Sequence, residues 1–147
     1  MRLILGLATF LAGLNAGLLM TGVLESIHMK TVGLGGYLQF HQPRDQLYRR
    51  VMPPLLLTLM ALCIVCGLFG MSGSARLLSW VAFALVALDI MLTVRVMVPL
   101  NGWLQKFDAL NPPPEAQQVR ERWYALHPLR TVLGLGAFVA LLVSGAP

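Results

Sequence analysis

Hydrophobic residues gather in four long runs, which are separated by stretches rich in charge, proline and glycine. The runs are 3–24, 51–70, 77–100 and 129–146, and the unbroken apolar part of the last is Leu129–Ser144. A helix needs roughly 20 apolar residues to cross about 30 Å of hydrocarbon, and a spanning helix satisfies its own backbone. The pattern predicts an all-α, multi-pass membrane protein that folds as a single up-down-up-down four-helix bundle.

The composition agrees with lipid as the solvent. Of 147 residues, 57% are hydrophobic and 12% are charged, whereas about a quarter of the residues of a soluble domain are charged. The net charge of +5 forms no basic stripe on a soluble domain, so we expect no nucleic-acid partner. The first run is longer than the apolar core of a secretory signal peptide, which favours a retained span over a cleaved leader.

Lysine and arginine concentrate in two stretches, 26–50 and 101–130, which we expect to be the long loops of the bundle. They are Lys30, Arg44, Arg49 and Arg50 in the first, and Lys106, Arg120, Arg122 and Arg130 in the second. The opposite side has only Arg2 and Arg76 besides the terminal amine. By the positive-inside rule, both long loops are predicted to be cytoplasmic and the protein to lie in the inner cell membrane.

The second loop is predicted to contain two short helices at the membrane interface. In "NGWLQKFDAL" (101–110) the apolar residues recur at helical spacing, and "NPPP" ends that helix. The stretch 115–126 is interpreted as the other short helix. Pro128 disfavours helical geometry at the residue before it, so His127 is predicted to be a hinge or an N-cap at the start of the fourth span.

Antiparallel order brings polar residues of different helices to the loop side of the bundle. These are Glu25, His28, Arg95, Asn101, Trp123, His127 and Arg130. Asn15 and Asp89 lie about 15 Å deeper, at 1.5 Å per residue. A carboxylate at that depth must be paired, hydrogen-bonded or protonated. The sequence leaves open whether Asp89 bonds to Asn15, pairs with Arg95 or Arg130, or acts as an acid or base.

Three further groups are candidate ligands or redox groups. Glu25 and His28 form one Glu-x-x-His pair, which is half of a bundle di-iron site and equally fits two interfacial polar groups. His41 is predicted to lie on the loop surface. Cys63 and Cys66 have the spacing of a redox dithiol, but they lie in an apolar helix without a nearby cation, which favours two inert core side chains.

The stretches "VPLNGWL" (98–104) and "RWYALHPLRT" (122–131) resemble the anthrone oxygenase-like family of small four-helix membrane proteins, most of which have no assigned function. The matching residues are Pro99, Leu100, Asn101, Arg122, Trp123, His127, Arg130 and Thr131. The resemblance covers the second half of the chain and hardly includes the first span. It implies an oxygenase that converts an anthrone-type polyketide, a hydrophobic small molecule, to a quinone with O₂.

Such chemistry needs a base, a cation for the oxyanion and an aromatic wall. His127 is the candidate base, and Arg130 is the candidate cation, with Arg95 as a second choice. Trp123 is predicted to stack on the substrate and Asn101 to orient a hydroxyl, and Asp89 completes the candidate catalytic set. Interfacial anchoring, helix capping and snorkelling would explain the same residues one by one.

Other functions remain open from the sequence. One is a metal-dependent oxidoreductase that uses Glu25, His28 and His127. Another is a non-catalytic membrane subunit, or a binder of lipid, quinone or haem. The expected partners leave open a homo-oligomer or a subunit of a membrane complex. Thiol–quinone exchange ranks last. The cofactor is likewise open: none, a single metal, or haem.

Overall fold

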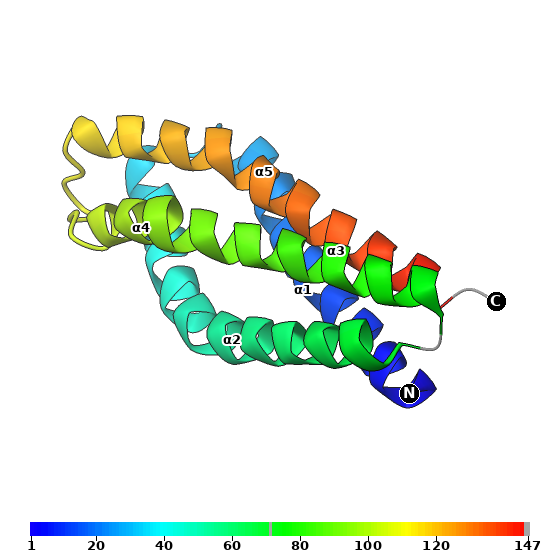
Figure 1. Ribbon diagram of the computed structural model, residues 1–147. Helices are drawn as coiled ribbons and strands as arrows, with labels where there is room; N and C mark the ends of the chain where they lie inside the picture. The colour runs from blue at the N-terminus through cyan, green and yellow to red at the C-terminus, as the bar shows by residue number, and fades with distance from the viewer. Residues whose placement is uncertain (71, 146–147) are drawn as a thin grey trace.

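The chain forms a bundle of four long helices in a computed structural model that describes residues 1–70 and 72–145 (Figure 1). The third span is a continuous rod of three pieces, α3, a π-helical turn η1, and α4. The elements are α1 (Arg2–Met29), α2 (Leu34–Phe69), α3 (Gly73–Leu92), η1 (Thr93–Met97), α4 (Val98–Leu104) and α5 (Glu115–Ser144). Each of the four rods is long and apolar enough to cross a membrane. The predicted all-α membrane bundle is confirmed.

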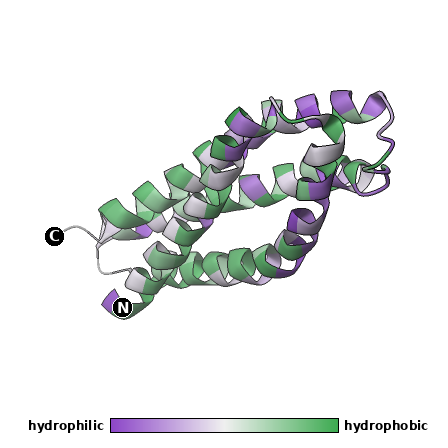
Figure 2. Cartoon of the chain, turned by 180° about the vertical axis from the view of Figure 1, so that it is seen from behind, coloured by the Kyte–Doolittle hydropathy of each residue, from purple (hydrophilic) through white to green (hydrophobic). Residues whose placement is uncertain are grey.

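The helices run antiparallel, so the connections separate into two ends. The start of α1, the end of α2, the start of α3 and the end of α5 lie at one end. The loops 30–33 and 105–114 lie at the other, which we call the loop end (Figure 1). Figure 2 shows that hydrophilic residues concentrate toward the loop end, whereas the rest of the rods is mostly hydrophobic.

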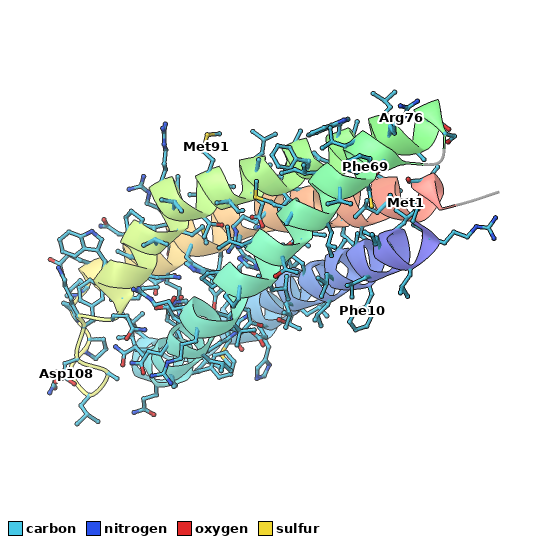
Figure 3. The ribbon with its side chains drawn as sticks, turned by 60° about the horizontal axis from the view of Figure 1, so that its bottom comes forward. Met1, Phe10, Phe69, Arg76, Met91 and Asp108 are labelled. Carbon is cyan, nitrogen blue, oxygen red and sulfur yellow. The ribbon has the colours of Figure 1, made fainter. Side chains whose placement is uncertain are left out.

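Small residues fill the middle of the bundle and apolar residues cover its outside. Ala12, Ala82 and Ala137 are fully buried, and such small side chains let membrane helices approach closely. Phe10 and Met91 point away from the bundle (Figure 3) and are 66% and 47% exposed. An outer surface of this kind suits contact with lipid tails.

The predicted loop 26–50 is wrong. Helix α1 continues to Met29, and α2 already begins at Leu34, so only 30–33 connect them. The buried positions of α2 include Leu38, His41, Asp45 and Met52, and spacings of three, four and seven residues keep them on one face of the helix. The inward face of the first part of α2 is therefore partly polar, and residues of α4 form hydrogen bonds with its polar groups.

The second loop also differs from the prediction. Helix α5 passes through Pro128 without a break, so the stretch 115–126 is the first part of the fourth span and His127 is neither a hinge nor an N-cap. Proline removes one backbone donor from a helix, and α5 packs along both α1 and α3, which holds it together. The first short helix ends at Leu104 as part of α4. Position 146 of the predicted fourth span lies outside the described residues.

The π-helical turn determines which residues of the third span face inward. The N–H of Val98 bonds to the carbonyl of Thr93, five residues back, and Pro99 has no N–H to offer. In a regular helix, Asp89 and Asn101 would be rotated by about 120° from each other. The wider turn removes most of this rotation, so both residues lie on the inward face, where both contact neighbouring helices.

Candidate functional site

A cavity of about 400 Å³ lies between the helices toward the loop end. Its lining is mainly apolar and comes from α1, α2, the third span and α5. Polar side chains that line it are His41, Arg44, Asp45, Tyr48, Arg49, Thr93, Asn101, Trp123, His127 and Arg130. Binding sites for small molecules have this character, an apolar hollow with a few convergent polar groups.

The cavity reaches the outer surface of the bundle between α2 and the third span. Pro53, Leu57, Val94 and Val98 line it, and the same side chains are exposed on the outside. Leu57 is 65% and Val94 is 60% exposed. This surface is apolar and lies along helices that are long and apolar enough to cross a membrane, so the opening suits contact with lipid.

His127 is held with one ring nitrogen bonded and the other free. Its Nε2 lies 2.9 Å from the carbonyl oxygen of Leu19, and since a carbonyl only accepts, Nε2 carries the hydrogen. The ring stacks on Trp123 with centroids 4.4 Å apart and planes 10° apart. Nδ1 is buried and has no hydrogen-bond partner among the described residues. In the neutral ring, Nδ1 is thus an unused base.

Close helix packing fixes this ring in place. A Cβ on Gly22 of α1 would collide with Nε2 of His127, so only glycine leaves room for the ring against α1. The hydroxyl of Thr131, one turn along α5, also donates to the carbonyl of Leu19, at 3.2 Å. The imidazole is therefore oriented by backbone and stacking together, which leaves it little rotational freedom.

Asn101 is the centre of a second polar group at the cavity. Its Oδ1 accepts from Nε1 of Trp123 at 2.8 Å and from Nε2 of His41 at 3.3 Å. Its Nδ2 donates to Asp45 at 2.6 Å, and Nδ1 of His41 lies 3.3 Å from the hydroxyl of Tyr37. Both nitrogens of His41 are engaged, in contrast to those of His127.

The sequence analysis did not predict that two members of this group are buried at the cavity. His41 was predicted to be on the loop surface, which is wrong, because it is 3% exposed. Asp45, which was not singled out, is buried and also accepts from Arg49 at 2.8 Å and from Gln105 at 3.1 Å. The spacing of both residues with Leu38 and Met52 would have indicated an inward helix face.

Asp89 pairs with Arg130, so of the open alternatives the ion pair is the one that forms. Nε of Arg130 lies 2.8 Å from Oδ1 of Asp89, which is fully buried. Arg130 lines the cavity and Asp89 lies behind it. Asn15 is also buried, close to Gly134, but neither end of its amide has a partner among the described residues. Arg95 is exposed and takes no part.

The sequence predicts that four polar residues from different helices gather inside the bundle. Asn15, Asp89, His127 and Arg130 are all buried inside the bundle. His127 and Arg130 line the cavity together with Asn101 and Trp123, whereas Asn15 and Asp89 lie outside its lining.

Comparison with known protein families identifies the family of this chain. A family model described as anthrone oxygenase matches residues 45–140, about two thirds of the chain. The chain belongs to the anthrone oxygenase family. No curated protein and no solved structure matches it. The stretch matched to the family begins at Asp45 and includes Asn101, Trp123, His127 and Arg130, whereas α1 and His41 lie outside it.

The metal candidates do not converge in this member of the family. Glu25 forms an ion pair with Arg44, at 2.9 Å, and His28 is exposed. In residues 1–70 and 72–145, no three or more His, Cys, Asp and Glu side chains gather in a way that could hold a metal ion. The donor set therefore does not fit a di-iron centre.

The two cysteines lie away from the polar groups. Cys63 and Cys66 are unbonded and buried, and Cys63 packs in the apolar core with Leu59 and Ala82. Neither thiol lines the cavity. This placement fits the interpretation of both as inert core side chains.

Proposed function

We propose that this protein is a membrane oxygenase that acts on a flat, lipophilic phenol of the anthrone type. The methylene carbon of the substrate loses two hydrogens and gains one oxygen atom from O₂. The second oxygen atom leaves with those two hydrogens as water, so the products are a quinone and water. No other oxidant or reductant is needed for this balance.

The observation that carries the proposal is that His127, which lines the cavity, has a ring nitrogen, Nδ1, without a hydrogen-bond partner among the described residues. A neutral imidazole with a free ring nitrogen can accept the proton that a carbon acid loses. The remaining anion is delocalised over the rings and passes one electron to O₂. The resulting carbon radical and superoxide combine, and the peroxide formed loses water to give the quinone.

The other cavity residues take supporting roles in this proposal. Arg130 compensates the negative charge that develops on the substrate oxygen, and Asp89 orients its guanidinium through Nε. Trp123 is fixed between His127 and Asn101, so it offers a rigid aromatic wall. Asn101 has its amide orientation set by Asp45, and it positions a substrate hydroxyl.

The route of the substrate follows from where the cavity opens. Its mouth between α2 and the third span is bordered by Leu57 and Val94, which face lipid. A lipophilic substrate dissolved in the bilayer, like O₂, enters there without crossing water. By the positive-inside rule, the basic residues near the loop end support an orientation with that end on the cytoplasmic side of the inner cell membrane.

The test is O₂ consumption by detergent-purified protein with anthrone as substrate, measured together with quinone absorbance. We expect His127→Ala and His127→Gln to lose at least about 100-fold in kcat, the usual contribution of a general base. His28→Ala, which changes an exposed histidine outside the cavity, is the matched control and retains activity. Wild-type turnover in a folded His127→Ala variant would exclude this mechanism.

A second candidate function, a quinone or lipid binder without catalysis, is favoured by the apolar lining of the same cavity. The two differ in one result: the binder takes up an anthraquinone but consumes no O₂ with anthrone. The absorption spectrum and metal content of the same sample decide the remaining alternatives. A Soret band identifies haem, and one equivalent of iron or copper identifies a metal-dependent oxidoreductase.

A further inference from the structure

A second concavity, of about 360 Å³, lies at the loop end and shares no lining residue with the first. It is formed where the end of α1 meets the first turns of α5. Its lining is Lys30, Gln117, Arg120, Glu121, Tyr124 and Ala125. The proposed oxygenase chemistry uses none of these residues.

Arg120 is a buried cation without an anionic partner. Its exposed fraction is 8%, and its guanidinium donates to the carbonyl of Val32 at 2.9 Å and to Oε1 of Gln117 at 2.6 Å. No carboxylate lies within ion-pair distance of it among the described residues. These two bonds use two of the five N–H donors of the group. A buried charge that no ion of the protein compensates favours an external anion.

Tyr124 and Lys30 add to this preference. The hydroxyl of Tyr124 is buried and has no hydrogen-bond partner among the described residues, and a buried hydroxyl is costly without one. Lys30 brings a second cation to the lining, against the single carboxylate of Glu121. That carboxylate already accepts from Nε2 of Gln117, at 2.6 Å.

The concavity lies at the depth of lipid headgroups. On α1, Leu24 and Ile27 are 60% and 68% exposed, which extends the lipid-facing surface to Ile27. Lys30 follows about 4.5 Å further along the axis, and the headgroup layer on each side of a bilayer is about 5–7 Å thick. Arg120 bonds to the carbonyl of Val32, so it lies at the same level as this layer.

We propose that this concavity binds a phosphate group, supplied by an anionic phospholipid of the surrounding bilayer. The guanidinium of Arg120 suits the geometry of phosphate oxygens, the hydroxyl of Tyr124 donates one more hydrogen bond, and Lys30 adds charge at the rim. The bound headgroup clamps the end of α1 to α5. Free phosphate has the same chemistry without the lipid tails.

The experiment measures the thermal unfolding midpoint of the full chain in an uncharged detergent. Phosphatidylglycerol, phosphatidylcholine and inorganic phosphate are titrated separately. We expect phosphatidylglycerol to raise the midpoint at concentrations at which the other two do not. Lys30→Gln removes one of the two cations that line the concavity and weakens the apparent affinity for phosphatidylglycerol about 5-fold. Arg120→Gln weakens it at least 10-fold.

The matched control is Lys106→Gln, which removes an exposed cation of the other loop outside this concavity and leaves the affinity unchanged. If Arg120→Gln does not fold, Lys30→Gln decides alone, because Lys30 is exposed. Equal stabilisation by phosphatidylcholine, or wild-type affinity in Lys30→Gln, overturns the proposed site. Equal stabilisation by inorganic phosphate overturns the lipid as its source.

Discussion

The buried pair of Asp89 and Arg130 gives the sharpest stability prediction. In Asp89→Asn the side chain keeps its shape and one oxygen that still accepts from Nε of Arg130, but the negative charge is gone. The guanidinium is then a buried cation without compensation. We expect a clear loss of stability and not a local rearrangement, because Asp89 is fully buried.

The magnitude follows from the geometry. The side chains of Arg130 and Asp89 are 10% and 1% exposed, and Nε and Oδ1 lie 2.8 Å apart. At an effective dielectric constant of 20, two charges at this distance attract by about 6 kcal/mol, of which desolvation cancels a large part. Removing one partner of a buried pair costs about 3–5 kcal/mol. Arg130 borders the cavity, so we expect about 3 kcal/mol.

The assay is reversible unfolding in mixed detergent micelles, with the free energy of unfolding measured for a double-mutant cycle. Asp89→Leu combined with Arg130→Met replaces the pair by apolar side chains, and we expect it to recover most of the loss of either single variant. A loss below about 1 kcal/mol in Asp89→Asn, or a coupling energy near zero in the cycle, would refute the reasoning, since both results mean that the pair is well hydrated.

Three further predictions concern the cavity. Gly22→Ala pushes a methyl group into the ring of His127, and we expect a loss of about 1–3 kcal/mol in stability, with lower O₂ consumption. Asn101→Leu leaves the partners of its amide unpaired, and we expect at least about 2 kcal/mol of destabilisation in the same unfolding assay. Leu57→Trp narrows the lipid-facing mouth, and we expect a lower kcat/KM for anthrone at unchanged stability; Leu68→Trp, on the lipid-facing surface of the same helix, is its control and keeps the wild-type value.

The apolar runs predicted the spans well because lipid imposes a simple rule on length and composition. The helices extend beyond those runs, and the prediction missed this where the inward face becomes polar. His41 and Asp45 follow Leu38 at helical spacing, but hydropathy alone ranks them as loop residues. Their polar groups are satisfied by Asn101, which comes from a distant part of the sequence.

The prediction for the other loop was wrong because it relied on the rule that proline disfavours helical geometry at the residue before it. Pro128 lies inside α5, and His127 before it is helical, because packing on both sides outweighs the one lost hydrogen bond. The candidate residues Asn101, Trp123 and His127 of the second half line one cavity, because antiparallel order brings them to the same end. The pairing of Asp89 with Arg130, by contrast, depends on helix rotation, which the sequence does not specify.

The central claim, that His127 removes a proton from a carbon acid bound in the cavity, can be tested without O₂. Anthrone is incubated anaerobically in D₂O with the purified protein, and deuterium uptake at its methylene carbon is followed by mass spectrometry. The mechanism predicts exchange well above the uncatalysed rate in the wild type and the uncatalysed rate in His127→Ala. Exchange at the wild-type rate in a folded His127→Ala variant would contradict it.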